Sequence, residues 1–152
     1  MKVTNLATHR VATIDASLPI AAAALAMRNN HVGALVVTAE EADRARPIGI
    51  ITDRDIVVSV VALGLDPNAI TAADIMSEQM FTADPEDDAY ATIRKMRVLG
   101  IRRAPVINAK GKLSGMFTMD DFIAFLAREM NEVSSLIAAE QLEEQTTRFA
   151  CE

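Results

Sequence analysis

The strongest constraint on this chain is a pattern that occurs twice: glycine, two apolar residues, threonine, two variable residues and aspartate. It covers residues 49–55 and again residues 115–121, so the copies lie 66 positions apart. Landmarks upstream of the pattern recur 69 positions later, for example Thr13 as Thr82. An internal repeat of this length indicates two copies of one folding unit, each unable to bury its apolar face alone.

Within each copy the pattern of apolar residues changes in the same order and predicts strand, helix, strand, strand, helix. Runs of β-branched and apolar residues predict strands at 11–14, 33–38 and 47–51 in the first copy and at 80–83, 102–107 and 113–117 in the second. The first helix of each copy should follow the capping candidates Asp15 and Asp84, and the second should begin at the Thr-x-x-Asp pattern. The three-residue difference between the offsets predicts a longer surface loop at 38–47. We therefore predict an α+β fold of two β-α-β-β-α units.

The second helix of the first copy should stop at Gly64, so we place the units at residues 1–66 and 67–128. Residues 129–152 form a predicted C-terminal helical extension that frays beyond about Gln145. Apolar residues three or four positions apart form one stripe along this last helix: Phe122, Leu126, Met130, Val133 and Ile137. Two arrangements stay open, because the stripe can pack against a second copy of the chain or fold back on its own units.

The net charge of −6 argues against a nucleic-acid partner, which requires a concentrated basic surface. Much of this charge lies in residues 129–152, which hold six acidic side chains and one arginine, so a small anionic ligand of the repeats stays compatible with it. The longest apolar run, residues 18–27, is shorter than the ~20 residues that span a bilayer, and no secretory signal pattern begins the chain. Cys151 is the single cysteine, which excludes an intramolecular disulfide, and we expect a cytoplasmic protein without a membrane partner.

The two units resemble a tandem pair of cystathionine-β-synthase (CBS) domains, the arrangement called a Bateman module. The resemblance is closest at residues 47–56 and 96–107 and covers about residues 1–128. One Gly-φ-φ-Thr-x-x-Asp pattern is weak evidence, whereas two copies with equivalent upstream spacing are strong evidence. The resemblance implies that the repeats pack with pseudo-twofold symmetry and bind adenine nucleotides or related adenosyl compounds in clefts between them.

By this resemblance Asp55 and Asp121 are the ribose-binding acids, and Thr52 and Thr118 lie beside them. The chemistry is sound, because a carboxylate accepts hydrogen bonds from two vicinal hydroxyls and a helix N-terminus presents free N–H groups. The resemblance also implies that the first strand of the opposite repeat forms each adenine pocket. These residues are Met80, Phe81 and Thr82 for the Asp55 cleft and Val11, Ala12 and Thr13 for the Asp121 cleft.

A nucleotide phosphate requires cations, and Arg102 and Arg103 match a basic pair that precedes Pro-Val in many family members. The planar fork of a guanidinium suits phosphate oxygens. Arg54 lies inside the first pattern and is a third candidate. The first repeat departs from the family at this point, because Gly33 and Ala34 stand at the positions of Arg102 and Arg103. The clefts should therefore differ, and either one or both can be occupied.

Plainer interpretations stay open for these residues. Each Thr/Asp pair can be only a helix cap, and the arginines can protect a strand edge. No Ser/His/Asp set, reactive cysteine or Walker-type loop points to an enzyme, and His9 and His31 lack the neighbours of a metal site. We expect a homodimeric regulatory module without an obligatory cofactor, whose ligand is AMP, ADP or ATP, with or without Mg. The alternative is a ligand-free scaffold or dimerisation module that regulates a separate, unidentified protein.

Overall fold

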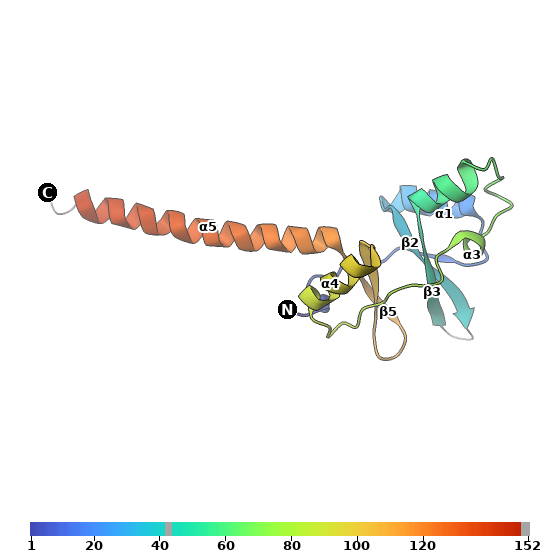
Figure 1. Cartoon of the computed structure of the whole chain (residues 1–152), viewed down its shortest axis with the longest axis horizontal. Coiled ribbons are helices and arrows are strands. Elements are labelled where there is room, and N and C mark those ends of the chain that lie inside the picture. The colour runs from blue at the N-terminus through green and yellow to red at the C-terminus, as the bar shows by residue number, and fades with distance from the viewer. Residues whose placement is uncertain (42–43, 150–152) are drawn as a thin grey trace.

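The computed structural model describes residues 1–41 and 44–149, and it has a mixed helix and strand fold in two adjoining lobes (Figure 1). The elements of the first lobe are β1 (Thr13–Asp15), α1 (Ile20–Asn30), β2 (Ala34–Glu41), β3 (Arg44–Thr52), α2 (Asp53–Ile56) and the π-helical turn η2 (Val57–Val61). Those of the second are α4 (Ala89–Leu99), β4 (Arg103–Ile107), β5 (Leu113–Thr118) and α5 (Met119–Phe149). Two short helices precede the repeats, η1 (Val3–Asn5) and α3 (Ala72–Ile75). The predicted α+β class is confirmed.

The sheets follow the predicted order of strands with two corrections. In the first repeat β1 pairs parallel with β2, and β2 pairs antiparallel with β3. In the second repeat β4 and β5 pair antiparallel, but the strand expected at 80–83 is reduced to one parallel bridge between Ala83 and Val106. The loop expected at 38–47 is also wrong, because β2 and β3 continue as paired strands beyond Thr38 and Pro47. The extra residues of the first copy therefore lengthen a hairpin.

Both first helices begin later than the capping candidates suggested. The carboxylate of Asp15 accepts hydrogen bonds from the hydroxyl of Ser17 and from its backbone N–H, the latter at 2.8 Å, and so closes a turn before the helix. These bonds, first the one from the hydroxyl, lower the pKa of Asp15. Pro19 is the N-cap of α1, and Asp88, four residues after Asp84, is the N-cap of α4. Asp88 accepts a hydrogen bond from the N–H of Ala91 at 2.9 Å, which lowers the pKa of Asp88. In both cases a short-range turn competes successfully for the earlier aspartate.

Each repeat completes its core with the segment that precedes the other repeat. Val3, in η1, is fully buried in the core of the second repeat together with Phe117 and Met96. Ala72, in α3, is buried in the core of the first repeat together with Ile51. The two hydrophobic cores therefore do not divide the chain at a single position, and neither repeat is closed without the other's leading segment.

The glycine of each sequence pattern lies where these exchanged segments cross the sheet. A Cβ on Gly49 would come within 2.6 Å of the sulfur of Met76, and a Cβ on Gly115 would come within 3.1 Å of the carbonyl oxygen of Thr8. The residue that follows each glycine is hydrogen-bonded to the crossing segment: Ile50 pairs with Ser77, and Met116 pairs with Thr8. Glycine is required here because two backbones approach closely.

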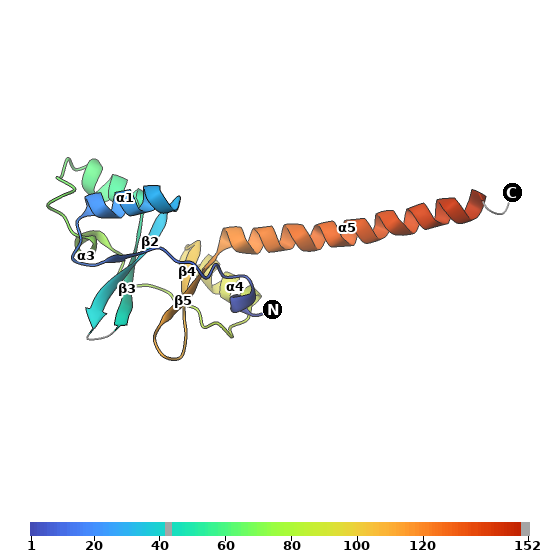
Figure 2. The same cartoon turned by 180° about the vertical axis from the view of Figure 1, so that it is seen from behind.

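The last helix, α5, runs from Met119 to Phe149 without interruption and projects away from both lobes (Figure 2). It continues as a helix past Gln145, where the apolar pattern fades. Its apolar side chains beyond the body are exposed, for example Met130 at 72% and Val133 at 58%. The first stripe residue, Phe122, is buried in the second repeat's core, whereas Met130, Val133 and Ile137 are left uncovered by the described residues. Cys151 lies outside the described residues.

Candidate ligand-binding clefts

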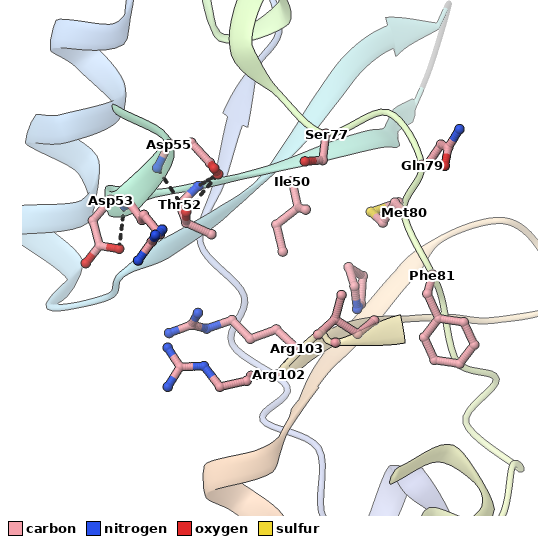
Figure 3. Close-up of a pocket in the computed structure, with 14 residues that line it drawn as sticks. Ile50, Thr52, Asp53, Asp55, Ser77, Gln79, Met80, Phe81, Arg102 and Arg103 are labelled. Carbon is pink, nitrogen blue, oxygen red and sulfur yellow. Dashed lines mark hydrogen bonds between the residues drawn. The ribbon is translucent and has the colours of Figure 1, made fainter. Parts of the chain in front are cut away.

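A cavity of about 350 Å³ lies between the two repeats beside Asp55 (Figure 3). We call it the Asp55 cleft. The first repeat contributes Ile50, Thr52, Asp53, Arg54 and Asp55, and the segment before the second repeat contributes Ser77, Gln79, Met80 and Phe81; Gly100, Ile101, Arg102, Arg103 and Pro105 complete the lining. Cavities of this size hold small molecules.

Thr52 and Asp55 form a reciprocal capping box at the start of α2. Oδ2 of Asp55 accepts hydrogen bonds from the N–H of Thr52 at 2.8 Å and from its hydroxyl at 2.7 Å. The N–H of Asp55 donates to the hydroxyl of Thr52 at 3.2 Å. The other carboxylate oxygen, Oδ1, has no hydrogen-bond partner among the described residues. Capping therefore uses one oxygen of Asp55 and leaves the other for a ligand.

Met80 and Phe81 supply apolar surface to the same cavity, and both are half-buried. They belong to the segment that leads into the second repeat, and Figure 3 shows them on the opposite side of the cavity from Asp55. Gln79, an exposed polar residue, lines the same cavity. The lining thus offers apolar surface for a planar ring and polar groups for its edges.

Three arginines bring positive charge to the Asp55 cleft. Arg54 belongs to α2, whereas Arg102 directly precedes β4 and Arg103 is its first residue. Figure 3 shows Arg102 and Arg103 extending in the same direction, toward the side of the cavity where Asp53 lies. Within residues 1–41 and 44–149 none of the three forms an ion pair. Their N–H donors are thus available to an anion.

A second cavity of about 300 Å³ lies beside Asp121, and we call it the Asp121 cleft. Oδ2 of Asp121 accepts hydrogen bonds from the N–H of Thr118 at 3.1 Å and from its hydroxyl at 2.6 Å. Here the other oxygen is also engaged, because the hydroxyl of Thr8 donates to Oδ1 at 3.4 Å. Arg10 and Arg103 are the arginines of this lining. The two clefts are therefore related by the repeat but differ in charge and in the availability of the acid.

Most of the residues expected at a site come together. The Asp55 cleft includes seven of them, namely Thr52, Arg54, Asp55, Met80, Phe81, Arg102 and Arg103. The Asp121 cleft includes Val11, Ala12, Thr118, Asp121 and again Arg103. Thr13 and Thr82 line neither cavity, because Thr13 pairs with Val36 in the sheet and Thr82 is an exposed residue before the Ala83 bridge.

The lining residues that were not anticipated include Thr8, Arg10, Ser77 and Gln79. They precede the two repeats at equivalent positions, because Thr8 and Arg10 recur 69 positions later as Ser77 and Gln79. These four residues can be found from the sequence by extending the alignment of the two repeats upstream of their first strands.

Two further classes of site were searched for in the described residues. No group of three or more His, Cys, Asp or Glu side chains there is arranged to hold a metal ion. Within the same residues no helix combines the length and apolarity needed to cross a membrane.

Several known proteins are similar to this chain in sequence or in fold. An uncharacterized protein of Methanopyrus kandleri is 38% identical over 97 residues, which cover 64% of this chain and 48% of that protein, so the chain spans about half the length of this relative. The structure of a hexameric CBS-CP12 protein from bloom-forming cyanobacteria has a TM-score of 0.72 and 30% identity, and the match covers 81% of this chain and 69% of that one. The CBS domain protein of Pyrobaculum aerophilum complexed with AMP has a TM-score of 0.72 and 28% identity, over 80% of this chain and 89% of that one.

The family model of the CBS domain matches the chain twice, at residues 3–62 and 72–128. Both matches include one Gly-φ-φ-Thr-x-x-Asp pattern and the acid of one cleft. The resemblance noted from the sequence is thereby confirmed: the chain belongs to the CBS domain family and carries two CBS domains in tandem.

Proposed function

We propose that this chain is a regulatory module that binds an adenine nucleotide (AMP, ADP or ATP) in the clefts between its two CBS repeats, without turning it over. The observation that carries the proposal is the half-engaged carboxylate of Asp55. Its Oδ2 is held by Thr52, its Oδ1 has no partner in the described structure, and a cavity with three arginines adjoins it. A ribose diol donates to such an oxygen, and the arginine N–H groups donate to the phosphate oxygens.

Two facts support a nucleotide over another anion. Met80 and Phe81 provide the apolar surface that an adenine ring needs, opposite the acid. The Pyrobaculum aerophilum protein, which has the same fold at 28% identity, was solved as a complex with AMP. Regulation then requires that the ligand bind one arrangement of the repeats more tightly than another.

The test is calorimetric titration of the full chain with AMP, ADP, ATP and adenosine, together with thermal melting. We expect saturable binding and a rise in melting temperature that grows with ligand concentration. The double variant Asp55→Asn with Asp121→Asn should lose both effects while its far-UV circular dichroism is unchanged. Binding that persists in this variant, or absence of binding by the wild-type chain at millimolar ligand, would overturn the proposal; so would nucleotide hydrolysis that these variants abolish.

A second candidate function, a dimerisation module, is favoured by the exposed stripe of α5. Met130, Val133 and Ile137 lie 72%, 58% and 49% exposed on a helix that projects from the body. Their 3–4 spacing is typical of helices that pair. We propose a homodimer in which these residues of two copies contact one another, consistent with the hexameric assembly of the CBS-CP12 neighbour.

Truncation after Arg128 tests the homodimer. We expect light scattering to give a twofold mass for the full chain and a monomer mass, or a strongly concentration-dependent one, for the truncated chain. A full chain that is monomeric at high concentration, or a truncated chain that dimerises equally well, would contradict a dimer held by α5.

A further inference from the structure

Arg103 contributes to the lining of both clefts. It belongs to the Asp55 cleft beside Arg102 and also to the Asp121 cleft beside Thr118, its antiparallel partner in the sheet. The side chain is half-buried, and in the described structure it forms no ion pair. A single guanidinium therefore lies between two candidate anion-binding cavities.

Arg103 can line both clefts because the first repeat has small residues, Gly33 and Ala34, where the second repeat has Arg102 and Arg103. A Cβ on Gly33 would lie 3.7 Å from Nη2 of Arg103 and 3.1 Å from Oδ2 of Asp53. Gly33 thus leaves open the space next to the guanidinium, where the second repeat has an arginine. With Ala34 at the position of Arg103, the first repeat supplies no corresponding arginine. The pair of clefts has one central cation where full repeat symmetry would place two.

We infer that Arg103 couples the two clefts, so that an anionic ligand in one weakens binding of an anionic ligand in the other; this rests on the proposed nucleotide function. When the guanidinium contacts a phosphate in one cleft, a second phosphate gains less attraction from the same positive charge and is repelled by the first. Arg102 and Arg54 remain for the Asp55 cleft, and Arg10 remains for the Asp121 cleft. Both clefts can therefore fill, but with unequal affinities.

The probes are AMP, which carries the phosphate, and adenosine, which lacks it. Single-cleft affinities are measured in Asp121→Asn, which keeps the Asp55 cleft, and in Asp55→Asn, which keeps the Asp121 cleft. We expect the second AMP to bind the wild-type chain at least about fivefold more weakly than it binds the corresponding single-cleft variant, within the usual range of coupling between sites. Adenosine should show no such difference, because it brings no charge.

Arg103→Gln should weaken AMP binding in both clefts and reduce the coupling to the part that direct repulsion between the two phosphates causes. Arg102→Gln is the matched control, since Arg102 lines only the Asp55 cleft, and it should weaken AMP binding there alone. The inference would be overturned, with the nucleotide function intact, if the wild-type chain had the same AMP dissociation constants as the single-cleft variants. It would also be overturned if Arg103→Gln weakened AMP binding in one cleft only. Failure of both AMP and adenosine to bind would instead overturn the nucleotide function and the inference with it.

Discussion

Replacing Asp55 with asparagine separates the two roles that this residue can have, capping of α2 and binding of a ribose. The asparagine carbonyl oxygen can take the place of Oδ2 and accept the hydrogen bonds that Thr52 donates at 2.8 and 2.7 Å. The amide NH₂ then occupies the place of Oδ1, so the position that faces the cavity changes from acceptor to donor. The cap should survive and the ribose contact should not.

The expected loss follows from the number of oxygens that are free. One oxygen of Asp55 is engaged by Thr52, so a ligand hydroxyl gains at least one charge-assisted hydrogen bond from the other. Such a bond contributes about 1.5–3 kcal/mol. Since ~1.4 kcal/mol is a factor of ten in affinity, adenosine should bind Asp55→Asn about 10- to 100-fold more weakly.

The chain provides a matched control in Asp74. Its Oδ2 accepts hydrogen bonds from the N–H and hydroxyl of Thr71 at 2.8 and 2.7 Å, the same geometry as at Asp55, and this bonding lowers the pKa of Asp74. Asp74 lines neither cleft. Asp74→Asn should therefore change thermal stability in the same direction as Asp55→Asn but leave adenosine binding as it is.

Adenosine titrations are made in an Asp121→Asn background, so that only the Asp55 cleft is read. The reasoning is refuted if Asp55→Asn binds adenosine as tightly as its parent. It is equally refuted if Asp74→Asn loses as much affinity, because the loss would then come from a weakened cap and its effect on the fold.

Three other substitutions or conditions test the fold that forms the clefts. Val3→Ala should lower the free energy of unfolding by about 2 kcal/mol in chemical denaturation, because Val3 is fully buried in the second repeat's core, whereas Val98→Ala, 81% exposed, should have little effect. The hydrogen bond from Ala91 holds the pKa of Asp88 below its ordinary value of 3.8. The stability that Asp88 contributes is therefore complete above pH 3.8 and is lost as the pH falls through the lowered pKa. Thermal melts below about pH 4 should show a fall in melting temperature that is smaller in Asp88→Asn. Gly115→Ala should weaken adenosine binding in the Asp121 cleft, because its Cβ would displace the carbonyl of Thr8, which lies 3.1 Å away; unchanged affinity would contradict this.

The sequence was sufficient for the class of fold, the strands of both hairpins and the position of Asp55 and Asp121 in the first turns of α2 and α5. These features depend on local chemistry: apolar runs predict β2 to β5, and Thr-x-x-Asp predicts the boundary between strand and helix at Asp55 and Asp121. Duplication strengthened each of these predictions, because a pattern seen once in isolation has several interpretations.

The features that were missed depend on contacts between distant segments. The second repeat's first strand is reduced to a single bridge at Ala83, and Met80 and Phe81, just before it, line the Asp55 cleft instead of pairing in the sheet. The starts of α1 and α4 were displaced because Asp15 and Asp84 bond residues two positions ahead. Thr8 and Arg10 line the Asp121 cleft because their segment pairs with the other repeat at Met116, a contact that only an upstream extension of the repeat alignment suggests.

The repeated pattern joins two requirements that a cleft between repeats must meet. Its glycine lets the other repeat's leading segment cross the strand at close range, as the 3.1 Å approach of Thr8 to the Cβ position of Gly115 shows. Its threonine, three residues after the glycine, ends the same strand, and its aspartate follows three residues later. The hydrogen bonds from the threonine hold the aspartate carboxylate beside the crossing segment. The crossing segment continues as one wall of the cavity, through Met80 and Phe81 in the Asp55 cleft. A cavity with a carboxylate at its edge thus arises where two backbones approach closely, and the strand whose glycine allows this approach also positions the acid.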